Sequence, residues 1–450
     1  MSYIANTNAE QEQMLRQIGV KSFEELIASI PNEIRLLDKF ELFPALSEYE
    51  VVKLFTEYAN QNLNSSEYAT FMGLGAYDHY GPALVNFVID RSEFKTAYTP
   101  YQAEVSQGTL QAMYEFQSMI CDLTAMDVAN ASMLDGGSAL AEAVLMAFAH
   151  NHRNEVVFAG QINPNYISTT KTITAGKNLN FLFAVDSDGT CDLNALEQIV
   201  TDKTTAVIFQ QPNAYGNLED YEAIERIAHS RGAMLIVVVD PISLGILKPP
   251  GEYNADIVVG EGQSLGIPLS FGGPFLGIFA TKQEFIRKIP GRLSGMTLDV
   301  DGKRAFVLTL QTREQQIKRE RATSNICTNQ GLMMLAATVY LSIMGKSGIK
   351  ELAEICFKKA HYLAEKIKEI NGYKLLNDKP FFREFLVIPP VEPEKIIAEG
   401  KKEKILAGID TSKFSGMHKG LLIAVTEKRT EDEINRFVEL LSRFSVKWEF

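Results

Sequence analysis

Residues 234–260 read MLIVVVDPISLGILKPPGEYNADIVVG and hold two short apolar runs with a polar stretch between them. The first run, Leu235–Val239, ends in Asp240, and the second run is Ile257–Val259. Short runs rich in β-branched residues are typical of strands that are buried on both faces of a parallel sheet. Polar residues at the ends of such strands lie along the edge where open α/β sheets bind ligands. The stretch therefore predicts an α/β fold with a candidate site near Asp240.

The same alternation of strand-like and helix-like segments continues over residues 128–280. The predicted strands are Glu155–Ala159, Asn180–Ala184, Ala206–Gln210, Met234–Asp240 and Ala255–Val259. The predicted helices include Ala139–Ala149, Leu193–Val200 and Asp220–Arg231. Strands that alternate with helices indicate an α/β domain whose sheet is largely parallel.

Changes in pattern divide the chain into three predicted parts. Residues 1–65 form a helical segment, in which Ser22 and Glu25 fit a capping box. Residues 66–335 form the large α/β domain. Residues 336–450 form a small α+β domain with a long charged helix over about 349–370 and a last helix whose capping box begins at Thr430.

Composition excludes several classes of partner. The chain has 450 residues and a net charge of −12, which gives no general attraction to nucleic acid or to anionic membranes. No signal peptide is visible at the start, and the longest apolar runs are strand-sized, so we expect a cytoplasmic protein. The four cysteines are scattered without a CxxC pair, and we expect neither disulfides nor a metal site.

A glycine-rich turn precedes the predicted helix Ala139–Ala149 and is a candidate anion site. It consists of Asp135, Gly136, Gly137 and Ser138, whose backbone amides and helix N-terminus suit a phosphate. An ordinary helix-capping turn is the alternative. Asp240 likewise could face a ligand or only start the turn with Pro241.

Two loops rich in aromatic and polar residues are candidates for an interface or for the lip of a pocket. The first is Ala76–Tyr80, within the glycine- and aromatic-rich loop 71–82, and includes Tyr77 and His79. The second, before the helix predicted from 109, contains Tyr98, Thr99, Tyr101 and Gln102. We expect these aromatic side chains to be exposed.

Several stretches together resemble one family, the glycine-cleavage P protein (glycine decarboxylase) in its split, two-subunit form. They are Phe71–Pro82, Ser92–Gln107, Val128–Ala143, Leu247–Asp256, Gly266–Pro274, Arg319–Gln330 and Leu421–Ile434. The resemblance covers nearly the whole chain in order. It implies the fold of pyridoxal-phosphate (PLP) transferases of fold type I, which resembles that of aspartate aminotransferase. In that fold an Asp in the place of Asp240 pairs with the pyridinium nitrogen, and a turn like 135–138 holds the phosphate.

The lysine that holds PLP as a Schiff base in that fold is missing from this chain. No lysine occurs between Lys248 and Lys282, and Gln263 stands near the expected position. An amide cannot serve as the amine nucleophile that this chemistry needs. The resemblance therefore implies subunit 1 of the pair, with a vestigial cofactor site at Asp135, Gly136, Gly137, Ser138 and Asp240.

The resemblance also implies an activity shared with other chains. Subunit 2 would carry the lysine and bind PLP, and two copies of each subunit would form an α2β2 assembly. That complex decarboxylates glycine, releases CO2 and transfers the aminomethyl group to the lipoyl arm of the H protein. This chain would shape the partner's pocket and would bind no PLP covalently.

Two other readings stay open from the residues alone. A self-sufficient PLP enzyme could recruit an atypical lysine, although neither Lys248 nor Lys282 fits the usual spacing from Asp240. A non-catalytic scaffold could also have kept the fold and lost every catalytic role, because fold alone does not fix function.

Overall fold

The computed structural model describes residues 5–35, 42–96 and 98–446, which divide into two units after Leu63. The N-terminal unit contains α1 (Asn8–Ile18), α2 (Phe23–Leu26) and α3 (Glu48–Ala59), and none of the residues in these helices is buried. The side chain of Ser22 caps α2 by accepting from the Glu25 N–H. The Glu25 carboxylate accepts from the Lys21 N–H at 2.8 Å, so the predicted capping box at Ser22 is only half formed.

The second unit is built on a seven-stranded sheet with the order β2-β8-β7-β6-β5-β3-β4. The strands β3 to β7 run parallel, whereas β8 and β2 are antiparallel to their neighbours at one edge. Their bounds are β2 (Val128–Ala129), β3 (Glu155–Ala159), β4 (Asn180–Ala184), β5 (Thr204–Gln211), β6 (Met234–Val239), β7 (Ile257–Glu261) and β8 (Gly277–Thr281). The mostly parallel α/β fold is thus confirmed.

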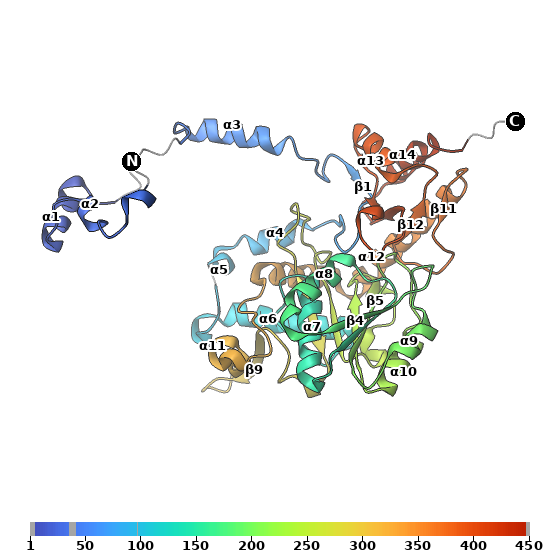
Figure 1. The fold of residues 1–450 in the computed structure, drawn as a ribbon, viewed down its shortest axis with the longest axis horizontal. Helices are drawn as coiled ribbons and strands as arrows, with labels where there is room; N and C mark the ends of the chain where they lie inside the picture. The colour runs from blue at the N-terminus through green and yellow to red at the C-terminus, as the bar shows by residue number, and fades with distance from the viewer. Residues whose placement is uncertain (1–4, 36–41, 97, 447–450) are drawn as a thin grey trace. The chain divides into compact units, whose positions relative to one another are not determined.

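Helices cover both faces of this sheet (Figure 1). Successive residues of β3 fall in different cores, since Val156 and Phe158 pack on one face while Val157 and Ala159 pack on the other. One face carries α7 (Gly136–Asn151) and α8 (Pro164–Ile173). The other carries α6 (Gln107–Thr124), α9 (Leu193–Ile199), α10 (Tyr221–Ser230) and α12 (Gly331–Lys368). Burial on both faces explains the uninterrupted apolar runs of the sequence.

The C-terminal part packs a four-stranded antiparallel sheet against helices. Its order is β11-β12-β15-β14, with β11 (Lys374–Leu375), β12 (Glu384–Ile388), β15 (Leu421–Ala424) and β14 (Ile409–Asp410). The helices are α13 (Pro393–Lys402) and α14 (Glu431–Ser442), and Thr430 forms the predicted capping box on α14. A short pair, β1 (Ala69–Thr70) and β13 (Ile405–Leu406), joins this part to the start of the unit.

The remaining elements lie around the large sheet. They are α4 (Ala83–Ile89), α5 (Ser92–Lys95), the hairpin β9 (Leu293–Leu298) and β10 (Arg304–Thr309), and α11 (Gln315–Lys318).

The element α12 consists of two helical segments joined by a kink, and the second segment lies where the helix over about 349–370 was predicted. The first segment, which begins at Gly331, was not predicted. Among the described residues, α12 is the one helix long and apolar enough to cross a membrane by length and composition, although part of its apolar stretch is buried inside the protein. Its first half buries Ala337 and Tyr340 in the core, which hides the one-sided pattern that marks a surface helix. Gly345 has non-helical dihedral angles and divides the helix.

Candidate functional site

The sheet brings the predicted cofactor residues to one edge. Asp240 follows β6, and Glu261 ends the neighbouring strand β7. The N-terminus of α7 reaches the same place, since the Gly136 N–H donates to Glu261 Oε2 at 2.9 Å. The carboxyl ends of parallel strands meet at this edge, where such folds bind their ligands.

Asp240 is paired with a buried arginine from the small sheet. Its Oδ2 lies 2.6 Å from Arg383 Nη2, and the Arg383 side chain is only 1% exposed. The guanidinium carbon stands 3.8 Å from the centre of the Tyr77 ring, which adds a cation–π contact. Among the described residues, neither Arg383 Nε nor Nη2 has a hydrogen-bond acceptor, so the contact with Asp240 is an ion pair. The ion pair therefore links the end of β6 to the start of β12 inside the protein.

A second set of charged groups continues this network to the loop after β15. The other side of the guanidinium contacts His79 Nε2, while His79 Nδ1 lies 2.6 Å from Glu427 Oε2. The Tyr80 N–H donates to Glu427 Oε1 at 2.6 Å, and Cys356 Sγ lies 3.8 Å from Oε2. Burial by itself would raise the pKa of Glu427, but the donors from His79 and Tyr80 lower it to about 2.

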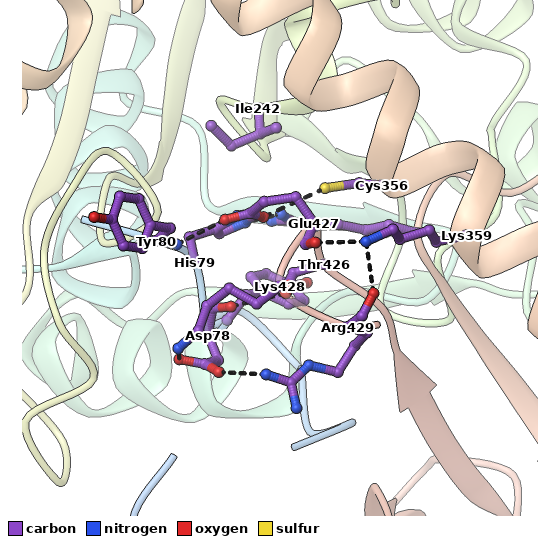
Figure 2. Close-up of polar contacts among 12 residues, drawn as sticks. Asp78, His79, Tyr80, Ile242, Cys356, Lys359, Thr426, Glu427, Lys428 and Arg429 are labelled. Carbon is purple, nitrogen blue, oxygen red and sulfur yellow. Dashed lines mark hydrogen bonds and ion pairs between the residues drawn. The ribbon is translucent and has the colours of Figure 1, made fainter. Parts of the chain in front are cut away.

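Asp78 and two cations fix the same loop from the other side, as Figure 2 shows. Asp78 binds Lys428 Nζ at 2.6 Å and Arg429 Nη2 at 3.1 Å. Lys359 donates to the carbonyls of Glu427 and Arg429 at 2.6 and 2.5 Å. The loop that contains His79 is thus attached to the loop after β15, which Lys359 in turn connects to α12.

His79, Cys356 and Glu427 offer the ligand types of a transition-metal site, and their ligand atoms lie within 4.8 Å of one another. Each of those atoms already has a protein contact. Arg383 also holds its positive charge against the His79 ring. A second cation there would be repelled at short range, so the geometry favours a hydrogen-bonded cluster.

The carboxyl group of Glu261 occupies the start of α7. Besides Gly136, it accepts from the Gln263 N–H at 2.9 Å and the Leu276 N–H at 3.0 Å. Burial raises the pKa of Glu261 to about 8, against these three amide donors, which favour the carboxylate. The Ser138 N–H donates to Asp135 Oδ1 at 2.7 Å, so a residue of the glycine-rich turn caps the helix that the turn begins.

Gln263 is 1% exposed and has a full set of partners. Its Oε1 accepts from the Tyr77 N–H at 2.8 Å. Its Nε2 donates to the carbonyls of Tyr77 and Ile267 at 3.1 and 2.7 Å. The Tyr77 hydroxyl in turn donates to Glu384 Oε2 at 2.8 Å. The residue near the expected lysine position therefore holds the loop of Tyr77 in place.

The expectation that Tyr77 and His79 are exposed was wrong. Tyr77 is 8% exposed and the His79 side chain 2%. Both rings point inward because Arg383, Glu384 and Glu427 offer buried partners for their polar atoms. The other predicted loop does lie at the surface, with Tyr98 86% exposed, Tyr101 46% exposed and Gln102 exposed, while Thr99 is half-buried.

A basic cavity lies beside Tyr101. It is lined by Arg287, Lys288, Arg292, Arg313 and Lys318, with the hydroxyls of Thr323, Ser324 and Thr328 and one acid, Glu314. The Arg292 guanidinium carbon lies 5.8 Å from the centre of the Tyr101 ring, and Gln316 donates to the Tyr101 hydroxyl at 2.9 Å. In the described chain, Arg292 and Arg313 donate to carbonyls and neutral side chains and make no ion pair. Such a cavity attracts anionic groups.

Sequence reasoning missed the charged partners. They are the buried Glu261, Arg383 and Glu384 and the half-buried Glu427. One signal was available, since Arg383 and Glu384 stand inside the apolar stretch 381–388, where charged residues are rarely buried without a partner. The residues 381–388 alone do not indicate which side chains pair with Arg383 and Glu384.

Comparison with known proteins supports the class that this geometry indicates. At 14% identity, the fold of a Lactobacillus brevis glutamate decarboxylase matches 93% of this chain and 96% of that chain with a TM-score of 0.68. The large parallel sheet, the glycine-rich turn and the aspartate after β6 define a protein of the PLP-dependent fold type I class.

The relatives narrow the class to a family. The family model of the glycine cleavage system P-protein matches residues 1–441. A probable glycine dehydrogenase (decarboxylating) subunit 1 of Prosthecochloris aestuarii is 55% identical over 448 residues, 99% of this chain and all of that protein. An inhibitor-bound crystal structure of glycine decarboxylase (P-protein) superposes with a TM-score of 0.89 at 39% identity, covering 99% of this chain and 100% of that chain. The chain belongs to the glycine cleavage system P-protein family.

The residues at the sheet edge do not fit the cofactor that this fold class binds. Asp240 already holds Arg383, Glu261 takes the first amide of α7, and Gln263 stands near the lysine position. The cavity between Asp240 and β12 measures about 20 Å³, which is room for one or two waters and not for a phosphorylated pyridine.

Proposed function

We propose that this chain is subunit 1 of a two-subunit glycine dehydrogenase (decarboxylating) and that it supports an active site carried by a second subunit. In this proposal subunit 2 supplies the lysine and binds PLP, which serves as the electron sink for loss of the glycine carboxyl group. The complex releases CO2 and transfers the aminomethyl group to the lipoyl arm of the H protein. Two copies of each subunit form the assembly.

The observation that carries the proposal is the state of Gln263. It is buried, both of its side-chain polar atoms are bonded, and it supplies no amine. The whole-length match to proteins named subunit 1 agrees with a chain that needs a partner.

The surface around Tyr101 supports a role at the partner's pocket. Tyr98 and Tyr101 are exposed aromatic side chains, and large aromatic residues are enriched in interfaces between subunits. The basic cavity next to Tyr101 offers positive charge to anionic groups that the partner or its substrates bring. We assign this face of the chain to the partner's active site.

The alternative of a self-sufficient PLP enzyme would need a lysine near Asp240. Lys359 and Lys428 approach the same network, but Lys359 donates to two carbonyls and Lys428 pairs with Asp78. Both amines already have protein partners, which favours the proposal that this chain is a subunit without its own Schiff-base lysine.

Co-expression with a lysine-bearing subunit tests the proposal. We expect a stable complex with glycine–bicarbonate exchange activity in the presence of H protein, and no activity from either chain alone. A visible absorbance band in this chain alone that borohydride abolishes would instead support the self-sufficient enzyme. Failure to form any complex would support the scaffold.

A further inference from the structure

We propose that side chains of this chain permanently take the positions that the cofactor occupies in the rest of the fold class. The Arg383 guanidinium takes the position of the protonated ring nitrogen beside Asp240, and Glu261 supplies acceptor oxygens at the start of α7. Residues 73–80 fill the space between these two groups. We call residues 73–80 the plug segment. This inference goes beyond the proposed function, which states only that the partner carries the cofactor.

The cation position is the first step. An aspartate at this place in the fold stabilises a protonated ring nitrogen, and without a cation its charge would be buried and unpaired. Arg383 Nη2 lies 2.6 Å from Asp240 Oδ2. Its planar guanidinium also lies over the Tyr77 ring at 3.8 Å. A flat, delocalised cation is thus held between a carboxylate and an aromatic face, as a pyridinium ring could be.

The acceptor position is the second step. The first amide of α7 points to the place where such helices bind phosphate. In this chain Glu261 Oε2 receives that hydrogen bond at 2.9 Å, while Oε1 receives two more from Gln263 and Leu276. The Glu261 carboxyl group therefore accepts the hydrogen bond that a phosphate oxygen would accept at the start of α7. Because Glu261 is part of β7, its carboxyl group stays at this position.

The plug segment is the third step. Its Leu74 N–H donates to Glu384 Oε1 at 2.6 Å, and Asn163 donates to the Leu74 carbonyl at 2.9 Å. Gly75 has a φ of +102° and lies so close to Asn163 that a Cβ there would stand 2.9 Å from its Nδ2. The segment thus passes between the large sheet and β12 with no room for an added ring.

The groups that take the cofactor's positions, which are Arg383, Glu261 and the plug segment, also connect the large sheet to the small one. Asp240 directly follows β6, whereas Arg383 directly precedes β12 and Glu384 is its first residue. The plug segment bonds to Gln263 on one side and to Glu384 and Glu427 on the other. The two sheets are therefore held in one fixed arrangement by contacts that no ligand needs to complete.

Chemical rescue of the full-length chain tests the cation position. Arg383→Ala removes the guanidinium and leaves Asp240 unpaired, so we expect a thermal midpoint several degrees below that of the unchanged protein. Millimolar methylguanidinium should restore part of that loss, whereas equal ionic strength of sodium chloride should not. The matched control is the double variant Asp240→Asn, Arg383→Ala, in which no carboxylate remains to attract the cation. Equal rescue of the single and double variants, or no rescue of either, would overturn the assignment.

A second variant tests the acceptor position even if Arg383→Ala does not fold. Glu261→Ala vacates the start of α7, and we expect inorganic phosphate to raise its thermal midpoint above that seen with chloride at matched ionic strength. The unchanged protein should show no phosphate-specific shift, because Glu261 holds the amides. A phosphate shift of the same size in both proteins would count against Glu261 as the occupant, as would no shift in the variant.

Placing a lysine at position 263 distinguishes two possibilities. Either side chains fill the cofactor position, or the position is open and lacks only the amine nucleophile. The variant Gln263→Lys, mixed with PLP, should give no visible imine band and no borohydride-stable adduct at residue 263. Formation of that adduct would show that the pocket is open and would refute the inference. These measurements need only this chain, so they can fail while the two-subunit function stands.

Discussion

Gln263 pairs with the backbone of Tyr77 as a neighbouring strand would, accepting from its N–H at 2.8 Å and donating to its carbonyl at 3.1 Å. The two residues lie far apart in the sequence, and the contact joins the loop after β7 to the plug segment. A primary amide can both accept and donate in this arrangement, whereas a lysine ammonium can only donate. The residue near the expected lysine position has thus acquired a structural role of its own.

Replacing Gln263 by Met should destabilise the protein by about 3 kcal/mol. The apolar side chain is similar in size, but the Tyr77 N–H and carbonyl would be buried without partners, at about 1–3 kcal/mol for each unsatisfied group. Urea unfolding of the purified chain measures the difference. The control Gln283→Met changes an exposed glutamine and should have little effect. Equal stability of the two variants would show that the pairing contributes nothing.

Glu427 should stabilise the fold above pH 5 and lose that contribution in acid. Its folded pKa of about 2 lies below the ordinary value of 4.5 because of the donors from His79 and Tyr80, against the opposing effect of burial. The stability is therefore fully present above about pH 4.5 and disappears as the pH falls towards 2. The shift corresponds to at most about 3 kcal/mol.

Unfolding of Glu427→Gln between pH 2 and 7 checks this expectation. The variant should be less stable than the unchanged protein at pH 6, and the gap should close in acid. Glu365→Gln, at an exposed ion pair with Lys368, serves as the control. A gap that does not change with pH would contradict the assigned titration.

Glu142 should have the opposite pH dependence. Burial raises its pKa to about 7, and its Oε2 has no hydrogen-bond partner among the described residues. A raised carboxyl pKa gives stability that is present below the ordinary value of 4.5 and lost as the pH rises through 7. Glu142→Gln keeps the shape without the charge, so it should gain up to about 3 kcal/mol over the unchanged protein between pH 5 and 9.

The control for Glu142 is Glu115→Gln on the exposed side of α6. Its stability relative to the unchanged protein should be the same at pH 5 and pH 9. If Glu142→Gln behaved in the same way, the carboxyl of Glu142 would have to find a partner that lowers its pKa.

Tyr98→Ala and Tyr101→Ala together should lower the activity of the two-subunit complex at least about tenfold, or weaken its assembly. The loss of two interface aromatic residues commonly costs more than about 1.4 kcal/mol, the equivalent of that factor. Exchange activity and gel filtration of the co-expressed pair measure both effects. The control is Tyr362→Ala on α12, an exposed tyrosine away from the loop. Unchanged turnover and unchanged assembly would refute the assignment of this face.

The amino-acid pattern was enough to predict the fold class, the parallel strands and the family. Apolar runs such as Leu235–Val239 and the cap at Thr430 are local patterns, and local patterns fix local structure because their hydrogen bonds and burial depend on near neighbours. The strands Glu155–Ala159 and Asn180–Ala184 were predicted with their observed bounds. Absence of a lysine between Lys248 and Lys282 was equally plain from the sequence.

The residues around the position of the missing lysine could be found only in the folded protein. Asp240, Gln263 and Glu261 each have at least one partner from a distant segment, and no periodicity relates those segments to one another. A buried charge must be paired, but many residues could satisfy that requirement, and the packing of β12 and the plug segment selects Arg383 for Asp240. The same packing turned Tyr77 and His79 inward, against the expectation from their loop, because burial removes their rings from water while Glu384 and Glu427 satisfy their polar atoms.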